Sequence, residues 1–277
     1  MNRGWSALPW LLGVTTATAA DAGFECLLEP SQVVEIRSSV EGVIASIAVH
    51  RGDTVRQGQP LMELKSAAER AAVDSARYRS QMEGQIASAR NRIDYATKKL
   101  ERMTELQRDN LVSAQVRDEA DAEKRLAEAE LLTAVEGREM AKIEYVRAQE
   151  QLALRSISSP FNGVVVDRLL NPGDLAEAGT GRKPALKVAQ IDPMRADVAL
   201  PASLFGQVKV GSRAWVSPVI GKARLAATVR GIDRVIDAAS GTFVARLEMP
   251  NPGAQVPGGA RCTATIDGVS APPRARP

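Results

Sequence analysis

The sequence predicts an elongated, multidomain α+β protein: a small β-sandwich split by an α-helical coiled-coil hairpin and followed by a small β-barrel. Three observations indicate this class. A pattern of strands punctuated by Gly-Asp pairs occurs twice, a long stretch without proline separates the two copies, and the last third is rich in short strands. Only 4% of the residues are aromatic, which favours long helices and Val-rich strands over a large aromatic core.

Residues 1–20 have the pattern of a secretory signal peptide. Arg3 supplies the positive charge, residues 7–14 supply a short apolar stretch, and residues 17–20 supply small side chains for cleavage. The apolar stretch is shorter than the roughly 20 residues that span a bilayer as a helix. We therefore expect cleavage and a mature chain that begins near Asp21, with an uncleaved membrane tether as the alternative.

The most informative feature is an internal repeat, with one copy in residues 35–65 and the other in residues 154–191. The repeated turn positions are Gly42, Gly52, Asp53 and Gly58 in the first copy and Gly163, Gly173, Asp174 and Gly179 in the second. Glycine adopts positive φ without a steric penalty and aspartate hydrogen-bonds its own backbone, so each Gly-Asp pair predicts a tight turn. Because neither half buries its apolar face alone, we expect the two copies to pair with each other.

The repeat resembles the biotinyl/lipoyl domain, a small β-sandwich of two similar halves. Carrier members of that family hold a lysine, flanked by methionines, at the turn that joins the halves. That motif is absent here, because roughly ninety residues separate the halves and Lys65 lies where the chain leaves the first half. We therefore expect no cofactor. A biotin or lipoate carrier is the alternative, which mass spectrometry of the mature protein would test.

Residues 66–153 predict an antiparallel helical hairpin, because they contain no proline and are rich in good helix formers. A heptad seam of apolar residues runs along the first arm: Met82, Ile86, Ala89, Ile93, Ala96, Leu100 and Met103. Turn-forming residues at 109–113 interrupt the pattern. The second arm carries a less regular stripe: Val116, Ala120, Leu126, Leu132, Ile143, Val146 and Leu152. At about 1.5 Å per residue, each arm of the rod would be roughly 60 Å long.

Residues 192–270, joined by the N-terminal segment 21–34, predict a small antiparallel β-barrel. The expected strands are residues 195–200, 213–216, 224–232, 242–249 and 261–266, with one short helix at 201–208. A return of the N-terminal segment to this barrel would bring Cys26 near Cys262. Export to an oxidising compartment permits a disulfide between them, but the sequence does not require one. The Pro- and Arg-rich residues 271–277 predict a disordered tail.

With these parts in this order, the mature chain resembles the membrane fusion proteins, or periplasmic adaptor subunits, of the HlyD-like and resistance–nodulation–division efflux type. In members that use outer-membrane channels of the TolC type, the hairpin tip carries an arginine, a leucine four residues on and a serine seven further on. Arg102, Leu106 and Ser113 have that spacing at the predicted turn. The resemblance implies that they contact the channel. The alternative gives them structural roles in the seam, on a solvated face and at a helix N-cap.

The resemblance also implies a periplasmic protein that associates with the inner membrane through its partners. These partners would be an inner-membrane transporter, of the resistance–nodulation–division class rather than the ABC class, and a TolC-type channel. Copies of the chain would stand side by side as a trimer or hexamer ring. Relatives often continue into a membrane-proximal β-domain, which we do not expect in this chain. A structural envelope spacer without a transport role is the alternative, and a neighbouring transporter gene would discriminate between the two.

The sequence offers little support for catalysis, metal binding or nucleic-acid binding. His50 is the sole histidine and lies beside a Gly-Asp turn, with no nucleophile arranged around it. No His/Cys cluster suits zinc, and the methionines are scattered. The net charge of +3 is small and well mixed, without the aromatic and basic patch that binds nucleic acid. We therefore expect a scaffolding protein and not an enzyme.

Overall fold

The computed structural model describes residues 23–179, 181–220 and 224–270. The expected signal peptide at 1–20 and the expected tail at 271–277 lie outside the described residues. The chain divides into two compact units. One unit holds the sandwich and the hairpin and comprises Glu35–Phe161 and Val165–Val188. The other holds the barrel and comprises Met1–Val34, Asn162–Val164 and Ala189–Pro277.

The sandwich is built from short strands of both repeat copies. They are β2 (Gly42–Ile47), β3 (Thr54–Val55), β4 (Pro60–Leu64), β5 (Ser156–Ser158), β6 (Gly163–Arg168) and β7 (Leu175–Ala176). One sheet has the order β5-β4-β2-β7, and β3 lies beside β6. Strands of the first copy thus pair with strands of the second copy in the four-stranded sheet and again between β3 and β6. The side chains of Ile44, Val55, Leu61, Val165 and Ala176 are almost fully buried in this unit.

Reciprocal hydrogen bonds show that the two copies close on each other. The Ile44 N–H donates to the Asp174 carbonyl at 2.9 Å, and the Val165 N–H donates to the Asp53 carbonyl at 2.9 Å. Ile44 and Val165 hold the same position in their copies, as do Asp53 and Asp174. The same bond is therefore made twice, once in each direction, which is the arrangement of a pseudo-two-fold sandwich.

The two Gly-Asp turns are also built alike. The Asp53 carboxylate accepts a hydrogen bond from the His50 N–H at 2.7 Å, and the Asp174 carboxylate accepts one from the Asn171 N–H at 2.8 Å. Positive φ angles between 77° and 107° occur at Gly52, Gly58, Gly173 and Gly179. Residues with a Cβ are strained in that region, which explains why glycine recurs at these positions.

Gly42 and Gly163 have a different role from the turn that we expected of them. Each is the first residue of a strand, β2 and β6 respectively, and neither has positive φ. At Gly42 an added Cβ would lie 2.6 Å from the Arg155 guanidinium and 3.2 Å from Leu64 Cδ1. Close packing, and not turn geometry, therefore favours glycine at residue 42.

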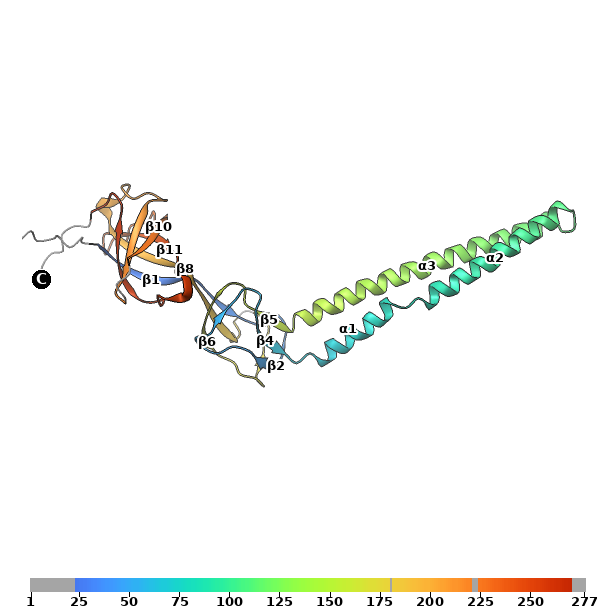
Figure 1. Cartoon of the computed structure of the whole chain (residues 1–277), viewed down its shortest axis with the longest axis horizontal. Coiled ribbons are helices and arrows are strands. Elements are labelled where there is room, and N and C mark those ends of the chain that lie inside the picture. The colour runs from blue at the N-terminus through green and yellow to red at the C-terminus, as the bar shows by residue number, and fades with distance from the viewer. Residues whose placement is uncertain (1–22, 180, 221–223, 271–277) are drawn as a thin grey trace, which may run out of the picture. The chain divides into compact units, whose positions relative to one another are not determined.

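The inserted segment forms a hairpin of three helices, α1 (Ala67–Ser80), α2 (Gly84–Arg108) and α3 (Ala114–Ala153). Figure 1 shows α1 and α2 following one another alongside α3. The first arm is not the single helix that we expected, because it is interrupted at residues 81–83. The N–H groups of Gln81 and Met82 bond the carbonyls three residues back, which tightens the chain at this point. Met82 lies in the interruption and is exposed, so it is not a seam residue.

The seam between the arms consists mainly of small residues. Buried positions are Ile86, Ala89 and Ala96 on α2 and Ala120, Ala127 and Ala148 on α3. The stripe predicted for the second arm is largely wrong, because Leu126, Leu132, Ile143 and Val146 are exposed. The helical period places Leu132, Ile143 and Val146 away from the partner helix, whereas Leu126 lies along the groove between α2 and α3 and is open to water there. Alanines at the seam let the two backbones approach closely.

The barrel contains six strands: β1 (Phe24–Ile36), β8 (Leu186–Pro201), β9 (Arg213–Pro218), β10 (Leu225–Ile232), β11 (Thr242–Met249) and β12 (Arg261–Ile266). Their order is β1-β12-β9-β10-β11-β8, and β8 also pairs with β1, which closes the ring. Its core includes Leu28, Val198, Leu200, Val229, Phe243 and Leu247, all fully or almost fully buried. Every other residue of β11 and β12 points inward, as the alternation in the sequence predicts.

Two details of the barrel differ from the sequence prediction. The expected helix at 201–208 is only a 3₁₀ helix of three residues, Ala202–Leu204, because Phe205 is extended and Gly206 has a φ of 89°. The expected strand at 195–200 is part of the longer β8, which continues through residues 192 and 193.

The N-terminal segment does return to the barrel as β1. Cys26 lies directly opposite Cys262 in the antiparallel pairing of β1 with β12. The structure joins the two residues by a disulfide, with their Cα atoms 4.9 Å apart. This covalent bond connects strands that are 236 residues apart in the sequence.

The hairpin tip as a candidate docking site

The tip turn is a Schellman motif that ends α2. The Asn110 N–H donates to the Gln107 carbonyl at 3.0 Å, and the Leu111 N–H donates to the Leu106 carbonyl at 2.9 Å. Asn110 has a φ of 58°, the left-handed conformation that this motif requires. Asparagine tolerates this conformation better than most residues with a Cβ. The turn therefore fixes where Leu106 and Leu111 lie relative to each other.

Ser113 begins the second arm without capping it. Its backbone is extended, with φ of −74° and ψ of 159°, as expected of the residue before a helix. Its side chain makes no hydrogen bond to the helix, however, and the residue is exposed. The hydroxyl of Ser113 is thus available to a binding partner at the very end of the rod.

Arg102 and Leu106 lie on the last two turns of α2. Arg102 is exposed and makes no ion pair with any other residue that the structure describes. Leu106 is half-buried. The structure therefore brings the three predicted tip residues to one end of the hairpin, with an unpaired guanidinium, a partly accessible leucine and an uncommitted hydroxyl.

Sequence reasoning missed Leu111, the most exposed apolar side chain of the turn. It is 70% exposed and follows directly after the left-handed Asn110. Exposing a leucine to water is unfavourable, by an amount that scales with its apolar area. Its place beside Val112 in a turn whose other residues are Asp109, Asn110 and Ser113 was a signal that could have drawn attention to it.

Ion pairs between the arms support the stem behind the tip. Arg92 lies 2.5 Å from Glu130, and Lys99 lies 2.6 Å from Glu123. The hydrogen bond that Lys99 donates to the Glu123 carboxylate, and then the negative charge of that carboxylate, raise the pKa of Lys99 above its ordinary value. Exposed pairs of this kind contribute little energy each, but they hold the two arms at a defined register.

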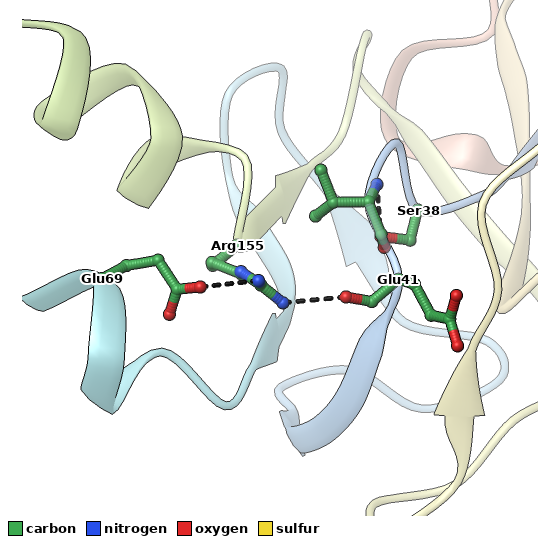
Figure 2. A network of polar contacts seen from close by, with 5 residues as sticks. Ser38, Glu41, Glu69 and Arg155 are labelled. Atoms are coloured by element: carbon green, nitrogen blue, oxygen red, sulfur yellow. Dashed lines mark hydrogen bonds and ion pairs between the residues drawn. The ribbon is translucent and has the colours of Figure 1, made fainter.

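At the base, Arg155 fastens the hairpin to the sandwich, as Figure 2 shows. Its guanidinium donates to the Glu41 carbonyl at 2.9 Å and to the Glu69 carboxylate at 2.6 Å. Its own carbonyl accepts from the Leu64 N–H at 2.8 Å. Arg155 thus joins the start of α1, the end of α3 and the edge of β2, and both arms leave the sandwich from one fixed point.

The described part of the chain was found to have neither a metal-ligand cluster nor a membrane-spanning helix. No group of three or more His, Cys, Asp or Glu side chains in residues 23–179, 181–220 and 224–270 is arranged to hold a metal ion. Within the same residues, no helix is both long and apolar enough to cross a membrane.

A sandwich of two repeat halves with an inserted helical hairpin, together with a small β-barrel, is the architecture of the membrane fusion proteins. The family model of the CzcB-like, barrel-sandwich hybrid domain matches residues 32–181, more than half of the chain. The chain belongs to this family of membrane fusion proteins.

Curated relatives agree with this assignment. The chain is 24% identical over 198 residues to the pyoverdine export membrane fusion protein PvdR of Pseudomonas aeruginosa, covering 71% of this chain and 51% of PvdR. It is 27% identical over 251 residues to the multidrug resistance protein MdtE of Escherichia coli strain K12, covering 86% of this chain and 62% of MdtE. The chain therefore spans only about half to three fifths of the length of these relatives.

Among solved structures, MacA from Actinobacillus actinomycetemcomitans matches with a TM-score of 0.72. The match covers 88% of this chain and 77% of MacA at 21% identity. At that identity the likeness shows the fold.

Proposed function

We propose that this chain is the periplasmic adaptor of a tripartite export pump. In this proposal the hairpin tip binds an outer-membrane channel of the TolC type, and the rest of the chain associates with an inner-membrane transporter of the resistance–nodulation–division class. The protein couples the two partners mechanically and catalyses no reaction.

The observation that carries the proposal is the tip itself. A rod whose α3 alone has 40 residues, about 60 Å at 1.5 Å per residue, is fastened at its base by Arg155. At its far end lie the unpaired Arg102, the uncapped hydroxyl of Ser113 and the exposed Leu111. A guanidinium offers five donors to carboxylates and carbonyls, and leucine fills an apolar notch, so these groups suit a protein partner.

A single tip offers few contacts and would bind weakly. Several copies in a trimer or hexamer ring would bind one channel through several tips, and the combined affinity would exceed that of each tip. The names of PvdR and MdtE, which refer to export and to multidrug resistance, support a transport role for this chain.

Substitution of the tip tests the proposal. A deletion strain of the host is first screened for compounds to which it has become sensitive, and the gene for the full chain is then returned with Leu106→Asp or Arg102→Asp. We expect both variants to lose protection, because a carboxylate replaces the apolar contact in one and reverses the charge in the other.

Leu126→Asp is the matched control, because Leu126 is an exposed leucine of the stem. It should protect the host as the parent does, and all three variants should keep the parent's helical circular dichroism. Full protection by Leu106→Asp would show that the tip assignment is wrong.

A further inference from the structure

The hairpin has one level at which both of its arms are built weakly, and this level lies one whole helix, α1, away from the base. The first arm is interrupted there at residues 81–83, while α3 passes the same level without a break, as Figure 1 shows. Arg138 of α3 lies 3.2 Å from Glu83, so the two arms are in contact at the interruption. We call residues 81–84 together with residues 137–138 the mid-rod segment.

The mid-rod segment contains both glycines of the hairpin, Gly84 and Gly137. Neither glycine has positive φ, and a Cβ added at either would meet no atom within 4 Å. Neither turn geometry nor close packing therefore requires glycine at these positions. Gly137 lies inside α3, where glycine is less favourable than alanine because it loses more conformational freedom on folding. Gly84 begins α2 and gives the first arm the same freedom beside its interruption.

The seam of α3 is also weakest at this level. Seam residues recur at intervals of four and three: Ala127, Leu131, Ala134, Arg138, Ala141, Tyr145 and Ala148. Ala127 and Ala148 are buried, whereas the five residues between them are only half-buried. The middle one is Arg138, whose Nε is buried and has no hydrogen-bond partner among the described residues. A charged residue in a seam position lowers the stability of the pairing, because its buried polar atoms lose their hydration.

The hairpin is packed more firmly on both sides of the mid-rod segment. Towards the tip, Ile86 and Ala89 are buried in the seam. Towards the base, Ala76 and Ala148 are buried, and Arg155 fastens both arms to the sandwich. The rod therefore consists of two better-packed parts, a tip half and a base half, with a less well-packed segment between them.

We propose that the mid-rod segment is a hinge at which the tip half of the hairpin bends relative to the base half. α3 stays continuous and bends at Gly137, while residues 81–83 absorb the change in length of the first arm. The ion pair of Arg138 with Glu83 acts as a latch between the arms. The Glu83 side chain is 77% exposed, so water screens the pair and it opens easily.

This hinge is a property of the chain alone, and its test needs no partner. Under the adaptor role proposed above, it would let the tip adjust to a partner while the base stays fixed. Loss of export in the tip variants would bear on the adaptor role only and would leave the hinge untouched.

Hydrogen exchange of the purified mature chain tests whether the mid-rod segment opens first. Within α3, we expect the amides of residues 134–141 to be protected about tenfold less than those of residues 118–127, because local opening is easiest where packing is weakest. The stiffened variant, Gly137→Ala with Arg138→Leu, should raise the protection of residues 134–141 about tenfold, since alanine favours helix and leucine fills the seam. Equal protection of the two stretches in the parent would overturn the proposal.

Thr104→Ala is the matched control, because it also raises helix propensity but at an exposed position in the tip half. It should leave the protection of residues 134–141 unchanged. A gain there as large as that of the stiffened variant would show that the mid-rod segment has no special role.

Single-molecule energy transfer tests whether this opening is a bend. Dyes are attached at Arg51→Cys, on a turn of the sandwich, and at Glu101→Cys, in the tip half; both residues are exposed. The two native cysteines are joined in the disulfide and leave no other thiol to label. We expect a broad distribution of distances in the parent and a narrower one in the stiffened variant, with circular dichroism confirming that both are helical. Equal widths in the two proteins, or the same narrowing by Thr104→Ala, would overturn the hinge.

Discussion

At the scale of single residues, Asn110 determines the shape of the tip. Its left-handed backbone places the Leu111 N–H on the Leu106 carbonyl. Valine at this position would clash with its own backbone, so we expect Asn110→Val to destabilise the turn by about 1 kcal/mol. The amide of Leu111 should then exchange roughly fivefold faster than in the parent. Hydrogen exchange followed by mass spectrometry of peptides across residues 105–115 measures this change.

Glycine provides the control for this prediction. Asn110→Gly keeps the left-handed conformation without strain and should leave exchange at the tip close to that of the parent. Exchange in α1, far from the turn, should be the same in all three proteins. If Asn110→Val exchanges no faster than Asn110→Gly, the Schellman turn does not depend on this residue.

Leu111 and Leu106 differ in accessibility. Under the proposed docking of the tip on an outer-membrane channel, this difference predicts which leucine contacts the channel first. Leu111 is 70% exposed, whereas Leu106 is half-buried against the stem. A photoreactive amino acid at residue 111 should therefore cross-link to the outer-membrane channel in intact cells with a higher yield than one at residue 106. Residue 126 on the stem should give no such product, and equal yields from all three positions would contradict the assignment.

At the scale of elements, the joint between hairpin and sandwich depends on the ion pair of Arg155 with Glu69. Both side chains are largely shielded from water, with 23% and 21% of their surface exposed. In a double-mutant cycle with Arg155→Met and Glu69→Gln, we expect a coupling energy of about 1 kcal/mol. The readout is thermal unfolding of the helical signal, because nearly all helix in the described chain belongs to the hairpin. Strictly additive effects would show that the pair does not fasten the base.

The elements also show what the sequence could and could not predict. The reciprocal hydrogen bonds of Ile44 and Val165 were predictable. The turns of both copies need glycine at the same spacing, so the repeat can be recognised in the sequence. The stripe on α3 was not, since Leu132 and Ile143 are as hydrophobic as core residues although they face outward. Hydrophobicity alone does not distinguish a buried face from a face that a partner would cover.

The interruption of the first arm and the tip leucine escaped prediction for related reasons. Residues 81–83 contain neither glycine nor proline, so only the neighbouring Gly84 pointed to a break. The spacing of Arg102, Leu106 and Ser113 was visible in the sequence, but the greater exposure of Leu111 follows from the turn geometry. Side-chain accessibility at a turn depends on a few backbone angles. The spacing of apolar residues in the sequence does not predict these angles.

At the scale of the whole molecule, the two units should respond separately to loss of the disulfide. Cys26 and Cys262 both belong to the barrel unit, and their bond constrains a very long loop in the unfolded chain. Removing such a bond costs about 2–5 kcal/mol. We therefore expect Cys26→Ser with Cys262→Ser to lower the melting temperature of the barrel and to leave that of the hairpin unchanged.

The chain provides a separate probe for each unit. In a protein that begins at Asp21, Trp215 is the sole tryptophan, and it lies on β9 with the Arg224 guanidinium 5.2 Å from the centre of its ring. Its fluorescence reports the barrel, whereas far-ultraviolet circular dichroism reports mainly the helices of the hairpin. In the double variant the fluorescence transition should move to lower temperature by several degrees, while the helical transition stays in place. If both transitions move together, the barrel and the hairpin unfold as one cooperative unit, and the stem does not derive its stability from its own seam and the sandwich at its base.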